Sequence, residues 1–126
     1  MDVPQTPGDW FYSRTSTGSA VRFGAPQSEG QFAMLCTPGS RTVALVRYGN
    51  FAAASSMTIR TETATRTLAA ARAANEGGMR AVLASADPLL DAMAFSKGRF
   101  AVEVAGAASL YLPSWPEVTR VIEDCR

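Results

Sequence analysis

Two cysteines are the residues of this chain with the clearest chemistry, because paired thiols can form a disulfide and an activated thiol can act as a nucleophile. Phe32, Met34 and Cys36 alternate with other residues, so they share one face of a predicted strand. Cys125 ends an apolar stripe of a predicted C-terminal helix. Both cysteines are therefore expected to face the core, and we predict a Cys36–Cys125 disulfide that staples this helix to a sheet.

The alternative is two buried free thiols, which pack as small apolar side chains. A disulfide would close a loop of roughly 90 residues and remove about 4 to 5 kcal/mol of unfolded-chain entropy. It would also indicate an oxidising compartment such as a periplasm. A catalytic thiol is disfavoured, because the chain contains no histidine to activate it.

The absence of histidine also removes the usual general base and the commonest transition-metal ligand. Two cysteines alone cannot complete a zinc site, and we find no phosphate loop, dinucleotide fingerprint or calcium-loop spacing. Asp87 and Asp91 share a helical face, but a helix cap and a first-turn charge explain them better than paired-carboxylate catalysis. We therefore predict no catalytic residue, no cofactor site and no metal site.

Four arginines form a candidate anion-binding stripe. Arg22 and Arg47 lie near the ends of predicted strands, and Arg60 and Arg66 lie in the segments that follow. The favoured alternative is that these arginines face solvent and that their stems cover a sheet face.

Three aromatic residues leave a similar choice. Trp10, Tyr12 and Trp115 could form a platform for a ligand or the edge of the core. The edge of the core is favoured, because large rings are mostly buried for their apolar area.

The composition predicts one globular domain without a strong charge. The 126 residues are 47% hydrophobic and 18% charged, and 12 basic residues against 11 acidic ones give a net charge of +1. Such a balance offers no field that would recruit nucleic acid or an anionic membrane. No stretch approaches the roughly 18 to 20 apolar residues of a membrane helix.

The first half of the chain predicts a β-meander, because it alternates with period two and is rich in β-branched and aromatic residues. Strands are expected at 10–14, 20–24, 31–36 and 41–48, with a type II turn at Pro38-Gly39. Residues 55–62 and 64–68 fit two further strands or one long bent strand. The alanine-rich stretch 68–76 favours a strand end followed by a loop over a glycine-capped helix.

The second half mixes strands with two helices. Strands are expected at 79–84, 99–104 and 109–112. Asp87 and Pro88 predict the cap and first turn of a short helix that ends near residue 95.

The C-terminal helix has its own signals. Ser114 and Glu117 have the spacing of a capping box. Glu117, Arg120 and Asp124 are spaced to form ion pairs along an outer face. The inward stripe consists of Val118, Val121, Ile122 and Cys125.

Residues 1–8 contain two prolines and a glycine and are expected to be a flexible linker before a single β-rich domain at 9–126. They carry neither the basic region nor the apolar run of a signal peptide. We expect that an export signal or lipid anchor has been removed.

The stretch Asp87-Pro88-Leu89-Leu90-Asp91-Ala92-Met93, then Gly98 and a strand, then Leu110-Tyr111-Leu112-Pro113 and a helix, carries a resemblance. It resembles small exported bacterial proteins of unknown function and, more distantly, the end of the invasion-associated locus B family. The likeness covers residues 87–126, implies an exported β-rich protein, and carries over no functional residue.

These features predict a mainly β fold, an antiparallel sandwich or partly open barrel with a short helix and a C-terminal helix. The expected role is a non-catalytic binding or structural accessory protein of the envelope, periplasmic or lipoprotein-type, whose partner is an envelope protein or a small ligand. The alternative is a secreted or periplasmic inhibitor of a hydrolase that presents the loop from Gly24 to Gly30 to a cleft. A third class, an enzyme that uses carboxylates, would need a deep cleft lined by at least two acids.

Overall fold

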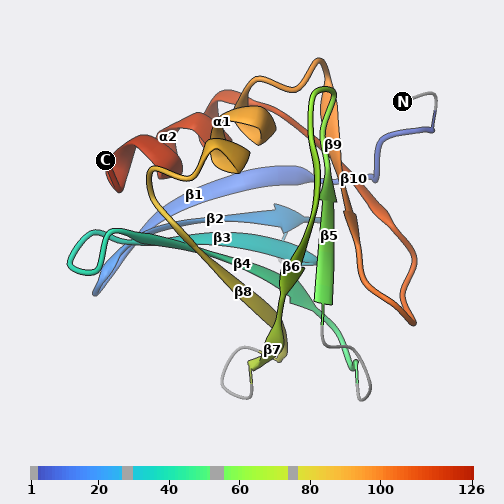
Figure 1. Ribbon diagram of the computed structural model, residues 1–126, viewed down its shortest axis with the longest axis horizontal. Helices are drawn as coiled ribbons and strands as arrows, with labels where there is room; N and C mark the ends of the chain where they lie inside the picture. Colours follow the sequence, from blue (N-terminus) through green and yellow to red (C-terminus); the bar gives the residue numbers. More distant parts are fainter. Residues whose placement is uncertain (1–2, 27–29, 52–55, 74–76) are drawn as a thin grey trace.

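The structure is a computed structural model, and it describes residues 3–26, 30–51, 56–73 and 77–126. Two antiparallel sheets and two helices form a sandwich-like arrangement, and over the described residues neither sheet closes into a barrel (Figure 1). The predicted mainly β fold is therefore confirmed. The elements are β1 (Asp9–Thr15), β2 (Gly18–Gly24), β3 (Phe32–Thr37), β4 (Thr42–Tyr48), β5 (Ser56–Arg60), β6 (Thr65–Ala69), β7 (Ala71–Ala73), β8 (Gly78–Ala84), α1 (Pro88–Ala94), β9 (Arg99–Glu103), β10 (Leu110–Pro113) and α2 (Pro116–Asp124).

The first sheet has the order β1-β2-β3-β4-β8-β7, and the second has the order β10-β9-β5-β6. Four consecutive strands, β1 to β4, form the expected meander. β5 and β6 are two separate strands that pair with each other, joined by a turn in which the Thr61 amide donates to the Ala64 carbonyl at 2.7 Å.

The alanine-rich segment differs from the prediction. Residues 71–73 form the strand β7, where we expected a loop and considered a helix, while residues 74–76 lie outside the described part. β6 belongs to the second sheet and β7 pairs with β8 in the first sheet, so the chain changes sheets at Ala70. Alanine is compatible with both helix and strand, and here the pairing with β8 makes residues 71–73 a strand.

The turn between β3 and β4 also differs. A type II turn needs a positive φ at its third residue, but the residue with a positive φ is Arg41, at 52°, and not Gly39. Thr37 pairs with Thr42, which leaves four residues to connect the strands. Two successive turns fill this loop, with the Arg41 amide donating to the Pro38 carbonyl at 3.1 Å.

The two helices begin in different ways. Asp87 caps α1, and its carboxylate accepts the Leu89 amide at 2.8 Å, as predicted. The capping box expected for α2 is wrong. Pro116 occupies the first helical position and makes Trp115 the N-cap, without a side-chain cap bond. Ser114 therefore lies before the cap, and its hydroxyl donates to the Met93 carbonyl at 2.8 Å.

The core lies against one face of the first sheet. In Figure 1, α1 and α2 lie over β1 and β2, and the second sheet crosses the other end of the first. Trp10 is at the centre of an aromatic cluster, with ring centroids 5.2 Å from Phe23, 6.3 Å from Phe32 and 6.5 Å from Phe100. Its indole nitrogen donates to the Pro113 carbonyl at 2.7 Å, so the two sheets share one core.

The Cys36–Cys125 disulfide is formed, with its Cα atoms 5.7 Å apart and a sequence separation of 89. It joins β3 to the C-cap of α2, and both side chains are buried. The prediction of a staple is confirmed, and both thiols are used in it. On α2, Val118, Val121 and Ile122 are buried beside it, as their spacing predicted.

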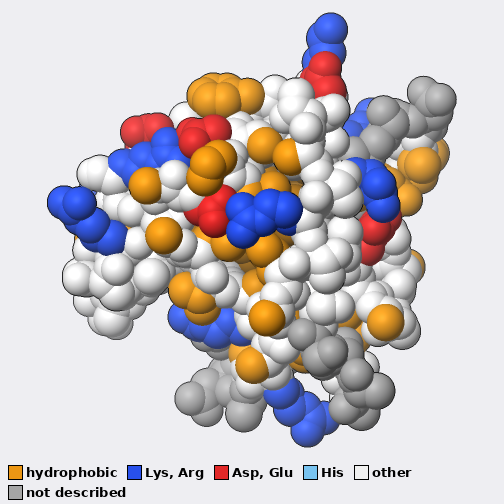
Figure 2. All heavy atoms as spheres, in the orientation of Figure 1, with side chains coloured by type: hydrophobic (Ala, Val, Ile, Leu, Met, Phe, Trp, Pro, Cys, Tyr) orange, Lys and Arg blue, Asp and Glu red, His pale blue; other side chains and the backbone are white. Residues whose placement is uncertain are grey.

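Several surface charges form ion pairs of opposite sign. Figure 2 shows acidic and basic side chains next to one another on the face that carries the helices. Arg126 forms a two-bond ion pair with Asp91 of α1, at 2.7 and 3.0 Å.

At the other end of the chain, the Thr6 amide donates to the Tyr111 carbonyl at 2.9 Å, so the segment predicted as a linker contacts β10. None of the described helices is long and apolar enough to span a membrane.

Candidate functional site

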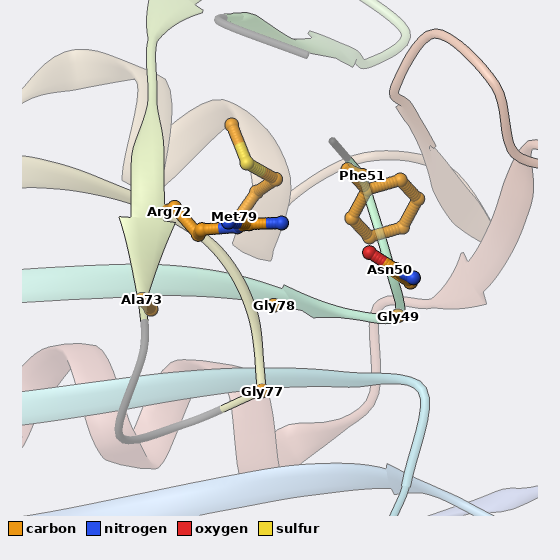
Figure 3. A pocket seen from close by; sticks show the side chains of 8 residues that line it. All are labelled: Gly49, Asn50, Phe51, Arg72, Ala73, Gly77, Gly78 and Met79. Atoms are coloured by element: carbon orange, nitrogen blue, oxygen red, sulfur yellow. The ribbon is translucent and has the colours of Figure 1, made fainter. Parts of the chain in front are cut away.

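A pocket of about 460 Å³ opens where β4 and β7 end and β8 begins (Figure 3). A volume of this order suits a small molecule. We call it the Phe51 pocket. Its lining consists of Gly49, Asn50, Phe51, Arg72, Ala73, Gly77, Gly78 and Met79.

Strand register places the side chains of this site. Met79 of β8 lies opposite Arg47 of β4 and opposite Arg72 of β7. Residues opposite each other in antiparallel strands share a face, so Met79 lies between two arginines on the face that covers the core. Met79 and Phe51 are both buried and form an apolar floor and wall.

Two glycines allow the chain to pass close enough to shape this pocket. A Cβ on Gly78 would lie 2.1 Å from the carbonyl oxygen of Arg47, and a Cβ on Gly49 would lie 2.7 Å from the Phe51 ring. Gly49 also has a φ of 139°, which side chains of other residues rarely permit. Larger residues at these positions would push apart the strands that position Arg47 and Met79.

Arg72 supplies the free charge of the pocket. Its side chain extends over Met79 toward the Phe51 ring (Figure 3). Within the described chain, Arg72 has no hydrogen bond and no ion pair, and it is exposed. Its planar guanidinium therefore keeps its five N–H donors for a ligand.

Arg47 is a second, more buried cation beside the same ring. It donates to the carbonyls of Tyr48 at 2.8 Å and Ala108 at 3.3 Å, and its guanidinium carbon is 5.6 Å from the centroid of Phe51. Its Nε is buried without a partner, and burial lowers the pKa of Arg47 below its usual value. Its described hydrogen-bond partners are all carbonyls, so no carboxylate among the described residues offsets this charge.

The four arginines of the predicted anion stripe are not brought together. Arg22 points away from the core, because Val21 and Phe23 beside it face inward. Arg60 pairs with Glu103 at 3.3 Å on the second sheet. Only Arg47 lies at the Phe51 pocket, while the fourth, Arg66, lies elsewhere.

The carboxylates of Asp87 and Asp91 each form an ion pair, Asp87 with Arg66 and Asp91 with Arg126. Burial raises the pKa of Asp87, but hydrogen bonds from Arg66 and the Leu89 amide outweigh this and lower it. The hydrogen bond from Arg126 lowers the pKa of Asp91. Both carboxylates are thus held ionised, whereas a general acid at neutral pH needs a raised pKa. These contacts confirm Asp87 as a cap and explain Asp91 as an ion-pair partner.

Arg72 was missed by the sequence analysis because the segment around it was expected to be a loop. The alternation Ala71-Arg72-Ala73 is the signal that could have found it, since period two places the arginine on one strand face. The short length of β7, three residues, made this signal weak.

The loop proposed for an inhibitor lies partly outside the description. Residues 27–29 of the stretch Gly24 to Gly30 are not among the described residues. Over the part of the chain that is described, no group of three or more potential metal-ligating side chains occurs.

No family model, curated protein or solved structure matches this chain. The functional interpretation therefore depends on the geometry of the site.

Proposed function

We propose that this protein is a non-catalytic binding protein of the bacterial cell envelope, periplasmic or attached to the envelope by a lipid. Its Phe51 pocket takes a small ligand that joins an anionic group to an apolar body. The observation that carries this proposal is Arg72, a guanidinium without a described partner that extends over buried Met79 and Phe51.

The pocket combines the features of a site for such a ligand. An apolar lining with a few well-placed polar groups is typical of small-molecule sites. An arginine binds a carboxylate or phosphate through two parallel hydrogen bonds. Arg47 adds a second positive charge over the Phe51 ring.

A binding role without catalysis is supported by the chemistry of the lining. None of the described lining residues is an acid, a hydroxyl-bearing residue or a cysteine. The chain has no histidine, and both cysteines are in the disulfide. The pocket can therefore orient an anion but offers it no general base or nucleophile.

The compartment is supported by the disulfide. Disulfides form and persist in oxidising compartments such as the periplasm. The Cys36–Cys125 bond is buried and links β3 to α2, so it is part of the fold. The resemblance of residues 87–126 to exported bacterial proteins supports the same compartment.

Binding can be tested with octanoate, which has a carboxylate on an apolar chain, and with 1-octanol as the uncharged control ligand. We expect Arg72→Gln to weaken octanoate binding at least about tenfold, since a charged hydrogen bond contributes about 1.5 to 3 kcal/mol. Octanol binding should be unchanged. Arg22→Gln, on the opposite face of the sheet, is the matched control and should bind octanoate like the wild type.

Two results would contradict the proposal. The ligand assignment fails if calorimetry detects no octanoate binding, or if Arg72→Gln binds octanoate as tightly as Arg22→Gln. The envelope assignment fails if fractionation of the source cells finds the protein with cytoplasmic markers and its cysteines reduced.

A further inference from the structure

A second hollow of about 570 Å³ lies where the start of α2 meets β1. β1 and β7 are opposite edges of the first sheet, so this hollow is separate from the Phe51 pocket. We call it the Trp115 cleft. It is lined by Tyr12, Trp115, Pro116, Glu117 and Arg120.

Trp115 presents its indole to solvent from a rigid position. It is 36% exposed, whereas Trp10, the other tryptophan of the chain, is 4% exposed and lies in the core. Trp115 is the N-cap of α2 and makes no side-chain cap bond, and the ring of Pro116 restricts the backbone that follows. The fold therefore does not use this indole for capping or for the core, and it remains available as a flat apolar platform.

Tyr12 holds Arg120 in place. The guanidinium carbon of Arg120 lies 3.8 Å from the centroid of the Tyr12 ring. That ring is fixed at its other end, because the Tyr12 hydroxyl donates to Asp124 at 2.6 Å. Arg120 is thus preorganised by stacking rather than by hydrogen bonds.

Two polar side chains of the cleft, Arg120 and Glu117, keep hydrogen-bonding groups without a partner among the described residues. The ion pairs expected between Arg120 and Glu117, and between Arg120 and Asp124, do not form within the described residues, because the guanidinium stacks on Tyr12 instead. Glu117 has no hydrogen-bond partner in the described chain either. The cleft therefore offers a planar set of donors and a carboxylate acceptor next to an exposed indole.

The charges of the cleft indicate which ligand it suits. Arg120 and Glu117 have opposite charges, so an ionic ligand would be attracted by one and repelled by the other. A neutral ligand with many hydroxyl groups can use both, since hydroxyls accept from a guanidinium and donate to a carboxylate. A sugar ring also has an apolar C–H face that can stack on an indole.

We propose that the Trp115 cleft binds a neutral sugar unit of a glycan. The ring stacks on Trp115, and its hydroxyls bond to Arg120 and Glu117. This proposal does not depend on the Phe51 pocket and stands or falls separately from the proposed ligand there.

The test uses the oxidised full chain with ¹⁵N-labelled tryptophan. The two indole N–H signals report on the cleft, through Trp115, and on the core, through Trp10. The probes are the β-1,4-linked tetrasaccharides of glucose and of N-acetylglucosamine, at up to millimolar concentration. We expect at least one of them to shift the Trp115 signal to saturation and to leave the Trp10 signal in place.

Binding of the sugar to each variant is measured by saturation-transfer NMR, which observes the signals of the sugar probe. Trp115→Ala should abolish these signals, and the unchanged Trp10 resonance would show that it folds. Arg120→Lys keeps the charge but loses the planar donors, and should weaken binding about tenfold. Phe95→Ala is the matched control, because Phe95 is an aromatic side chain that is 76% exposed outside the cleft, and it should bind like the wild type.

Three outcomes would overturn the proposal. The first is that neither tetrasaccharide shifts the Trp115 signal. The second is that folded Trp115→Ala keeps the sugar signals of the wild type. The third is that a proline-rich peptide saturates the Trp115 shift while neither sugar does, which would make the cleft a peptide groove.

Discussion

The carboxylate of Asp124 accepts a hydrogen bond of 2.6 Å from the hydroxyl of Tyr12 and so joins the last turn of α2 to β1. The hydroxyl of Ser19, on β2, donates to the same oxygen at 2.8 Å. The next residue, Cys125, is bonded to Cys36 of β3. The end of α2 is therefore attached to three consecutive strands of the first sheet.

The bond from Tyr12 makes stability depend on pH. It is the largest cause that lowers the pKa of Asp124; burial opposes it, and Ser19 adds to it. A carboxylate with a lowered folded pKa stabilises the fold above its unfolded value of about 3.9, and this stabilisation is lost as pH falls through the folded pKa. Tyr12→Phe should therefore lower the free energy of unfolding near neutral pH, and the difference from the wild type should shrink toward about pH 2.

Urea unfolding of both proteins at the two pH values checks this, because titrations common to both cancel in the difference. Tyr48→Phe is the control, since the Tyr48 hydroxyl has no hydrogen bond to a described residue. A Tyr12→Phe difference of equal size at both pH values would show that Asp124 is not the partner that matters.

The disulfide should contribute a large share of the stability. We expect the Cys36→Ala/Cys125→Ala variant to lose about 2 to 5 kcal/mol of unfolding free energy, because its unfolded chain is no longer constrained. It should still fold, since Val118, Val121 and Ile122 continue to bury the inner face of α2. Chemical unfolding measures the loss, and the dependence on denaturant should become steeper, because the unfolded chain without the cross-link exposes more surface.

Disulfide formation itself can be checked on the wild-type protein. Alkylation under denaturing, non-reducing conditions should add no label to the intact mass, because both cysteines are bonded to each other. Two labels would show free thiols and would also remove the argument for an oxidising compartment.

Strand faces were predictable from the sequence, because alternation is a local property. Phe32, Met34 and Cys36 were expected to share the core face, and all three are buried. The helical stripe that ends at Cys125 follows from a period of 3.6 residues in the same way. Two independent local patterns were therefore enough to predict a contact between residues 89 positions apart.

The candidate site could not be predicted, because it depends on pairing between distant strands. Arg72 enters the Phe51 pocket only because the chain leaves the second sheet after β6 and β7 pairs with β8 of the first sheet. Arg66, six residues earlier, instead meets Asp87 at 2.6 Å. Alternation places each arginine on one face of a strand, but it does not tell which strand that one pairs with. The capping box predicted for α2 is wrong for a local reason, because Pro116 places the start of the helix after Ser114.

The ion pair between Arg126 and Asp91 should be visible as a pKa change rather than as a large stability change. Arg126 lowers the pKa of Asp91 through hydrogen bonds of 2.7 and 3.0 Å. Arg126→Ala should therefore raise that pKa toward the usual value of about 3.9, as measured by carboxyl ¹³C shifts. The pKa of Asp87, which is lowered by Arg66, is the internal control. An unmoved Asp91 would mean that the pair does not persist in solution.

The approach of β2 to β3 should make Gly18 intolerant of a side chain. A Cβ at this position would lie 2.0 Å from the carbonyl oxygen of Cys36 and 2.7 Å from the Pro38 ring, so one strand end would have to move. Overpacking of this kind costs about 1 to 3 kcal/mol, and we expect that loss for Gly18→Ala.

Gly39 in the neighbouring hairpin is the matched control, because it has open space around its Cβ position and no positive φ. Gly39→Ala should be neutral or should stabilise by up to about 1 kcal/mol, since it reduces the freedom of the unfolded chain. Chemical unfolding of the two variants separates these effects, and equal stabilities would mean that β2 and β3 do not approach as closely as the structure shows.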